Sequence, residues 1–148
     1  MRAAIPARLS IGIAIAALSA ATALASANVS CRIDDAILAF ELEAIAGRAG
    51  PIVQVQTGTI RIKPSAMKLA SPQVAFGREQ IVQQWSRGDE LRLHIEAGDE
   101  AARENVVLVI LARRDKAKDN YRGRYVLQVS SGGGTREFKG RIKECVAG

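Results

Sequence analysis

The sequence predicts a mainly β protein, either an antiparallel β-sandwich or a small barrel, with one short helix after an N-terminal signal peptide. Apolar and polar residues alternate in several short segments, which is typical of half-buried strands. Glycine, proline and aspartate separate these segments and mark turns. No long helical segments are spaced to connect parallel strands, so we expect antiparallel pairing.

Five segments carry the strand pattern most clearly. Residues 53–62 and 91–95 alternate, and residues 106–112 form a continuous apolar run rich in β-branched side chains, which suits a central strand. The last two expected strands are 121–130, with odd-numbered residues facing inward, and 136–145, with even-numbered residues facing inward.

The segment 35–47 is compatible with two structures. It has helix propensity, and Gly47 stands where a helix would end. Leu38, Phe40 and Leu42 also alternate with alanine and glutamate. We favour a strand over 36–46, which a disulfide between the chain ends would tie beside the last strand.

One short helix is expected at residues 78–87. Ile81, Val82 and Trp85 would share one face of this helix, and Gly88 would end it. Trp85 is then expected to cover one end of the core. A tryptophan that stacks on a ligand is the alternative.

The glycine run 132–134 is expected to form a hairpin turn between the last two strands. Paired residues must face the same side of the sheet, which restricts the register. A two-residue turn at Gly133 and Gly134 satisfies this condition. It places Arg124 directly opposite Lys143.

The first 27 residues have the composition of a secretory signal peptide. Arg2 and Arg8 precede the apolar stretch 9–24, which is followed by Ala25, Ser26 and Ala27. A charged start, a short apolar stretch and a small-x-small site are typical of a cleaved signal. A membrane-spanning helix would need about 20 apolar residues, so we expect no transmembrane segment in the mature chain.

Cleavage after Ala27, or after Ala25, would leave a single domain over residues 28–148. The short, alanine-rich signal is typical of bacteria, so we expect a periplasmic or secreted protein. Lipid attachment at Cys31 is the alternative. Asn28 argues against it, because an apolar residue normally occupies that position in a lipoprotein signal.

The two cysteines of the chain, Cys31 and Cys145, lie near the two ends of the predicted mature domain. In an exported protein this arrangement predicts one disulfide. The sequence has no Cys-x-x-Cys motif and no cluster of His and Cys that would hold zinc. We therefore expect no metal ion and no cofactor.

Catalytic residues are not apparent. His94 is the one histidine, and alternation points it outward between Arg92 and Glu96. Acidic pairs such as Asp34-Asp35 are adjacent in sequence, and adjacent residues diverge on a strand. We expect a non-catalytic protein. A hydrolase that uses carboxylates brought together by the fold, or an inhibitor of an extracellular enzyme, are the alternatives.

Basic residues are concentrated near the end of the chain. The full chain carries 21 basic and 15 acidic residues, and loss of Arg2 and Arg8 leaves a net charge of +4. Residues 113–143 hold ten basic and three acidic residues. The basic residues expected on the outer face of the last two strands are Arg122, Arg124, Lys139, Arg141 and Lys143.

These five residues, called the basic face below, are the candidate anion-binding site. The partners that fit are anionic lipid headgroups, acidic glycans or an acidic envelope protein. Nucleic acid is not expected, because Tyr121 and Tyr125 point inward and leave no outer aromatic for stacking. The alternative is a solvated face that blocks edge aggregation. The sequence thus predicts a small exported binding or envelope-associated β module.

Overall fold

The computed structural model describes residues 27–47 and 51–147. The signal peptide predicted for residues 1–27 therefore lies almost wholly outside the described residues. The described part contains a 3-10 turn, η1 (Arg78–Gln80), and nine strands: β1 (Ala27–Asp34), β2 (Leu38–Ala46), β3 (Ile52–Ile62), β4 (Gln73–Ala75), β5 (Ile81–Arg87), β6 (Glu90–Asp99), β7 (Glu104–Asp115), β8 (Asn120–Ser131) and β9 (Gly134–Ala147).

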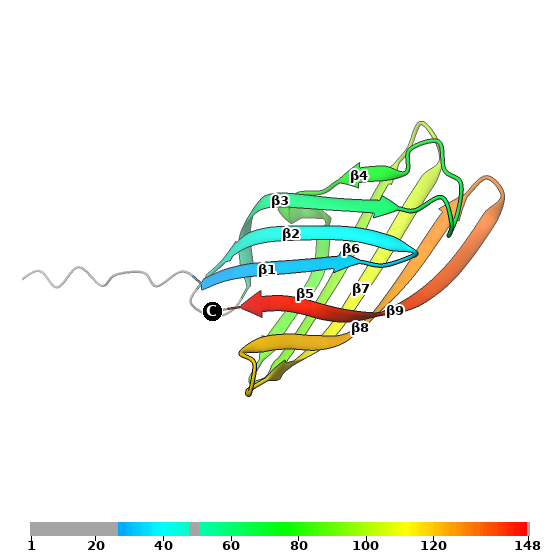
Figure 1. Ribbon diagram of the computed structural model, residues 1–148. Helices are drawn as coiled ribbons and strands as arrows, with labels where there is room; N and C mark the ends of the chain where they lie inside the picture. The colour runs from blue at the N-terminus through cyan, green and yellow to red at the C-terminus, as the bar shows by residue number, and fades with distance from the viewer. Residues whose placement is uncertain (1–26, 48–50, 148) are drawn as a thin grey trace, which may run out of the picture.

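All nine strands belong to one antiparallel sheet in the order β4-β3-β2-β1-β9-β8-β7-β6-β5. The mainly β, antiparallel prediction is therefore confirmed. The sheet curls into a half-barrel, so the described residues form neither two separate sheets nor a closed barrel (Figure 1). The strand predicted over 36–46 is also confirmed as β2, but β1 lies between it and β9.

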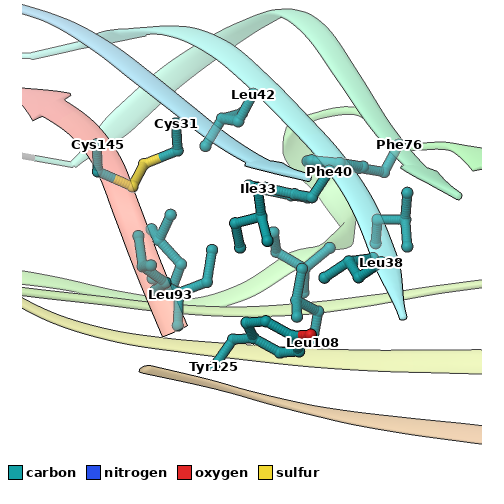
Figure 2. Close-up of a cluster of buried hydrophobic side chains, with 14 of the residues drawn as sticks. Cys31, Ile33, Leu38, Phe40, Leu42, Phe76, Leu93, Leu108, Tyr125 and Cys145 are labelled. Atoms are coloured by element: carbon teal, nitrogen blue, oxygen red, sulfur yellow. A yellow bond between two sulfur atoms is a disulfide. The ribbon is translucent and has the colours of Figure 1, made fainter. Parts of the chain in front are cut away.

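The core lies between the two halves of the curled sheet. Alternate residues of β2 are buried, and Phe40 stacks on Phe76 with ring centroids 5.9 Å apart. Leu42 of β2 lies across the core from Leu93 of β6 and Leu108 of β7 (Figure 2). The alternation in the sequence therefore reports the inner face of the sheet correctly.

The helix predicted at 78–87 is wrong. Only Arg78–Gln80 form a single 3-10 turn, and β5 then pairs with β6. A β-bulge between Ile81 and Gln83 interrupts the alternation, so the segment does not have the simple two-residue period of a strand. Trp85 consequently does not cover the core, and 47% of its surface is exposed.

The β8–β9 hairpin is shifted relative to the predicted register. Ser131 pairs with Gly134, so the turn residues are Gly132 and Gly133. Arg124 consequently faces Arg141 rather than Lys143. The prediction of the alternating faces holds from Phe138 to Ile142, but it fails at the end of β9.

A second bulge explains that failure. Tyr121 pairs with Cys145, and two residues on, Gly123 pairs with Ile142. Two residues of β9, Lys143 and Glu144, therefore oppose Arg122 alone. Because the bulge adds one residue, both Ile142 and Cys145 face the core although they are three positions apart.

The predicted disulfide between Cys31 and Cys145 is confirmed. The two residues are directly opposite on β1 and β9, with Cα atoms 4.1 Å apart, and both are buried. The β1–β9 ladder has only four residue pairs. Figure 1 shows β9 curving away from β8 to reach β1 at this joint. The disulfide therefore fastens the place where the two halves of the sheet meet.

Beyond this ladder, Tyr125 connects the two halves. Its ring lies over Gly140 of β9, and its hydroxyl donates a hydrogen bond of 2.7 Å to Asp35 in the β1–β2 turn. The same carboxyl group accepts the backbone N–H groups of Ile37 and Leu38. Burial raises the pKa of Asp35, but these hydrogen bonds together lower it below its ordinary value.

Replacement of Tyr125 by Phe is expected to lower the free energy of unfolding by about 1 to 2 kcal/mol at pH 7, because Asp35 loses a charge-assisted hydrogen bond. Because the pKa of Asp35 is lower in the folded than in the unfolded chain, its ionised form stabilises the fold at pH values above the unfolded pKa of about 3.9. This stabilisation is lost as the pH falls through the pKa of the folded state. The difference between variant and parent should therefore shrink below about pH 4. Urea unfolding at pH 7 and at pH 2.5 measures it.

Tyr121→Phe, at a buried tyrosine of the same strand, is the control for loss of a hydroxyl group. Equal losses for the two variants at pH 7, or a Tyr125→Phe penalty that does not change with pH, would contradict the role assigned to the bond with Asp35.

Side chains also bridge the two ends of the sheet. Gln84 on β5 accepts the backbone N–H of Ile52 on β3 and donates to its carbonyl, at 2.6 and 3.2 Å. Arg78 donates to the same carbonyl at 2.7 Å. Glu104, only 9% exposed, accepts the N–H groups of residues 70–71. These polar contacts hold the half-barrel together where strand pairing ends.

Candidate anion-binding surface

The outer face of β5–β9 carries a row of residues that lie side by side on successive strands. Strand pairing aligns one residue from each strand: Trp85, Arg92, Leu111, Arg124 and Arg141. Neighbouring strands are about 4.8 Å apart, so the row spans roughly 19 Å. Figure 1 shows β6, β7 and β8 side by side, opposite the wall made by β1–β3.

All five residues of the basic face are exposed, but their surroundings differ. Arg122 lies 3.8 Å from the carboxylate of Asp115 across the β7–β8 pair. Lys139 lies 3.0 Å from the carboxylate of Glu137. These two basic residues thus have acidic neighbours in the sheet.

Arg124, Arg141 and Lys143 form the uncompensated part of the basic face. Among the described residues, no carboxylate lies within 4.0 Å of their charged groups. Arg124 and Arg141 are directly opposite, and like charges in that position destabilise a strand pair. A bound anion would remove the repulsion.

Sequence reasoning missed Trp85 and Arg92, which lie in the same row on the far side of Leu111. The Arg92 guanidinium lies 5.1 Å from the centroid of the Trp85 ring, a cation–π contact. The carboxylate of Glu90 is 3.3 Å from both Arg92 and Arg113. Trp85 contradicts the expectation of an outer face without aromatic residues. The β-branched and aromatic residues of 81–85 are the sequence signal for a strand here. The bulge between Ile81 and Gln83 breaks the two-residue alternation and so obscures this signal.

Two shallow hollows flank the row. One, of about 680 Å³, is bounded by Arg92, Arg113, Arg122 and Arg124, with one acid, Glu90, over Leu111. The other, of about 700 Å³, lies beside it and shares Arg92 and Leu111. Its lining also includes Val82, Trp85, His94 and Val109. The first hollow is therefore lined mainly by arginines, whereas its neighbour, called the apolar hollow below, combines apolar side chains with the polar Gln83, Gln84 and His94.

The outer surface at the joint between β1 and β9 is more acidic. A hollow there is lined by Ser30, Arg32, Glu41, Glu43, Asn120, Glu144 and Val146. Arg32 is paired with Glu41 at 3.1 Å, and the Ser30 hydroxyl donates to Glu43 at 2.7 Å. The basic face on β8 and β9 thus borders a more acidic surface at the joint with β1.

The acidic pair Asp34-Asp35, and likewise Asp99 at the end of β6, bind structural partners. Asp34 accepts from Lys63 at 2.6 Å, and this contact lowers the pKa of Asp34. Its neighbour Asp35 faces Tyr125 instead. Asp99 accepts from the Ser71 hydroxyl at 2.8 Å, which lowers the pKa of Asp99. The two acids at 34 and 35 therefore diverge, as expected for adjacent residues.

His94 lies on the outer face, as the alternation predicts. Its Nε2 is 3.1 Å from the Glu96 carboxylate. Within residues 27–47 and 51–147, no three His, Cys, Asp or Glu side chains are grouped closely enough to hold a metal ion. Among the described residues, no helix is long and apolar enough to cross a membrane.

Comparisons with profiles of known protein families, with curated proteins and with solved structures each find no match. The geometry and charge of the outer surface are therefore what indicates a function.

Proposed function

We propose that the protein is a small exported, envelope-associated binding module whose basic face engages anionic partners. The observation that carries this proposal is the direct opposition of Arg124 and Arg141, with no carboxylate of the described residues within ion-pair distance. The export part of the proposal depends on the signal-like composition of residues 1–27.

Charge arrangement supports binding over simple solvation. A face that only kept the protein soluble would gain from interspersed charges of both signs. Several basic residues elsewhere on the sheet do have an acidic neighbour, such as Arg32 with Glu41 and Arg114 with Asp119. The Arg124–Arg141 pair departs from that pattern and costs a few tenths of a kcal/mol unless an anion lies over it.

The hydrolase alternative has less support. Three candidate carboxylates accept hydrogen bonds from structural partners: Asp34 from Lys63, Asp35 from Tyr125 and Asp99 from Ser71. These hydrogen bonds connect different segments of the fold. Glu104 likewise holds a loop backbone. No specific observation favours an inhibitor of an extracellular enzyme over binding to an anionic partner.

The double variant R124S/R141S is expected to bind dextran sulfate about tenfold more weakly than the parent at low salt. Each basic residue near an anionic surface contributes roughly 1 kcal/mol to the binding free energy. Two residues in partial contact with the polymer would together contribute about 1.4 kcal/mol, which corresponds to a tenfold change in affinity. Binding of the parent should weaken as salt rises, because the screening length shortens from about 30 Å at 0.01 M to about 8 Å at 0.15 M. Fluorescence anisotropy with a labelled polymer measures both effects.

The matched control is R61S/K68S, which removes the same charge from exposed positions in and beside β3, on the other half of the sheet. It should bind nearly as the parent does. The melting temperature of R124S/R141S should be unchanged or slightly higher, since the substitution removes a like-charge pair. Equal binding by both double variants, or no polymer binding by the parent, would refute the proposed function.

A further inference from the structure

Apolar side chains lie among the basic ones on the outer face of β5–β8. Leu111 sits between Arg92 and Arg124 in the row described above. In the adjacent row, Val109 pairs with Val126, which in turn faces Lys139. All three apolar residues are only half-buried although they point away from the core. The surface therefore offers apolar contacts within reach of its positive charges.

Trp85 and Val82 extend this apolar area to the edge strand. They are 47% and 49% exposed, and both line the apolar hollow that adjoins the basic one. The Arg92 guanidinium covers part of the Trp85 ring. The exposed part of the tryptophan ring leaves apolar surface in contact with water, which is unfavourable. A tryptophan side chain fits an environment that is apolar on one side and polar on the other.

These observations favour a partner that is itself amphiphilic. An acidic polysaccharide would contact Arg124 and Arg141, and a sugar ring can stack on Trp85, but the aliphatic Val109 and Leu111 would still face water. An anionic bilayer presents phosphates for the arginines and, a few ångströms deeper, an apolar layer for the ring. Tryptophan is enriched at that boundary, and arginine stems pack on apolar surface while their charged ends stay among the headgroups.

We propose that the outer face of β5–β9 docks on the surface of an anionic phospholipid bilayer, with Arg124 and Arg141 against the phosphates and Trp85 at the boundary of the acyl chains. The inference rests on the proposed function, because it names the partner of the same basic face. It adds Trp85 and the apolar hollow as the part of the site that distinguishes a lipid surface from other polyanions.

Trp85 is the one tryptophan of the chain and therefore reports its own environment. With vesicles of phosphatidylglycerol and phosphatidylcholine in equal amounts, its emission should shift to shorter wavelength. Lipids brominated on the acyl chain should quench it. Vesicles of phosphatidylcholine alone should produce neither effect at the same lipid concentration, because the phosphate contacts would lack net negative charge to attract the face.

Co-sedimentation with the mixed vesicles measures the variants. Trp85→Ala should bind about tenfold more weakly, since part of the apolar contact is lost. R124S/R141S should bind about 25-fold more weakly, at roughly fivefold for each basic residue. Val53→Ser, at an exposed valine of β3 on the other half of the sheet, and R61S/K68S are the matched controls and should bind as the parent does. Circular dichroism and melting establish that each variant is folded.

The outcomes separate this inference from the proposed function. If R124S/R141S binds dextran sulfate more weakly than the parent, but the parent does not bind the mixed vesicles, the partner is an acidic polymer and the membrane inference is wrong. Failure with both probes refutes both proposals. Vesicle binding that Trp85→Ala leaves intact also overturns the inference.

Two further results would oppose a membrane partner. If soluble glycerol phosphate competes at concentrations comparable to the lipid, the site takes a free phosphate and the bilayer is not its partner. If the Trp85 emission shifts with protein concentration in the absence of lipid, a second copy of the chain covers the face instead. Either result replaces the bilayer as the occupant of this surface.

Discussion

The double variant C31A/C145A is expected to lower the free energy of unfolding by up to about 5 kcal/mol, the largest effect of any substitution considered. The disulfide closes a loop across a sequence separation of 114 residues. Constraint of an unfolded chain over a loop of this length corresponds to about 5 kcal/mol of chain entropy. Small domains have a total stability of about 5–15 kcal/mol, so the variant would be marginally folded.

The position of the disulfide strengthens this expectation. The four pairs between β1 and β9 are the backbone ladder that joins the two halves of the described sheet, and Cys31 faces Cys145 within it. Without the covalent link, separation of the halves would expose the core on both sides of the joint. Hydrogen exchange should then rise first in β1 and at the end of β9.

Urea unfolding of the parent and of C31A/C145A measures the loss. The dependence of the unfolding free energy on urea should be steeper for the variant, because its unfolded chain is less compact. The parent reduced with a phosphine should unfold with the same midpoint as the variant, which separates the covalent link from changes in packing. A loss below about 1 kcal/mol would show that the ladder alone holds the joint.

Gly140→Ala is expected to lower the free energy of unfolding by about 3 kcal/mol. A Cβ atom at residue 140 would lie 2.3 to 2.5 Å from three atoms of the Tyr125 side chain, closer than any real contact. Overpacking of this kind costs roughly 1–3 kcal/mol. If the ring moves to make room, it also loses its hydrogen bond with Asp35, so the two penalties add.

A double-mutant cycle tests this explanation. In Tyr125→Leu the smaller side chain leaves space, so addition of Gly140→Ala should then cost less than about 1 kcal/mol. Gly132→Ala in the hairpin turn is the matched control, because nothing lies within 4 Å of a Cβ atom there. Additive penalties in the cycle, or equal penalties at residues 132 and 140, would be incompatible with the contact described. Thermal or urea unfolding gives all four values.

Local pattern in the sequence determined the class of the fold and the sides of most strands. The alternation in 91–95 and 121–130 predicts which residues are buried, because a strand repeats every two residues whatever its neighbours are. The pairing of Cys31 with Cys145 also follows from their number and places, given the expectation of export. The five residues of the basic face were all placed correctly on the outer side of the last two strands.

Tertiary contacts decided the rest. Residues 81–87 satisfy a helical pattern as well as a strand pattern, and pairing with β6 selected the strand and brought Trp85 to the outer face. The bulge opposite Arg122 depends on the joint between β9 and β1, since Cys145 must face inward to reach Cys31. The first depends on the neighbouring strand of a hairpin and the second on a strand distant in sequence, so the propensity of either segment alone cannot reveal them.

The geometry of the candidate site depends on the register of the β8–β9 hairpin. A shift of the β8–β9 register by two residues keeps every side chain on its predicted face, so the alternation is equally satisfied by both registers. Only the folded hairpin places Arg124 opposite Arg141, and Tyr125 opposite Gly140. The sequence by itself determined that a basic face exists, and the packing of β8 against β9 decided which charges meet, because register is set by contacts along the whole strand pair.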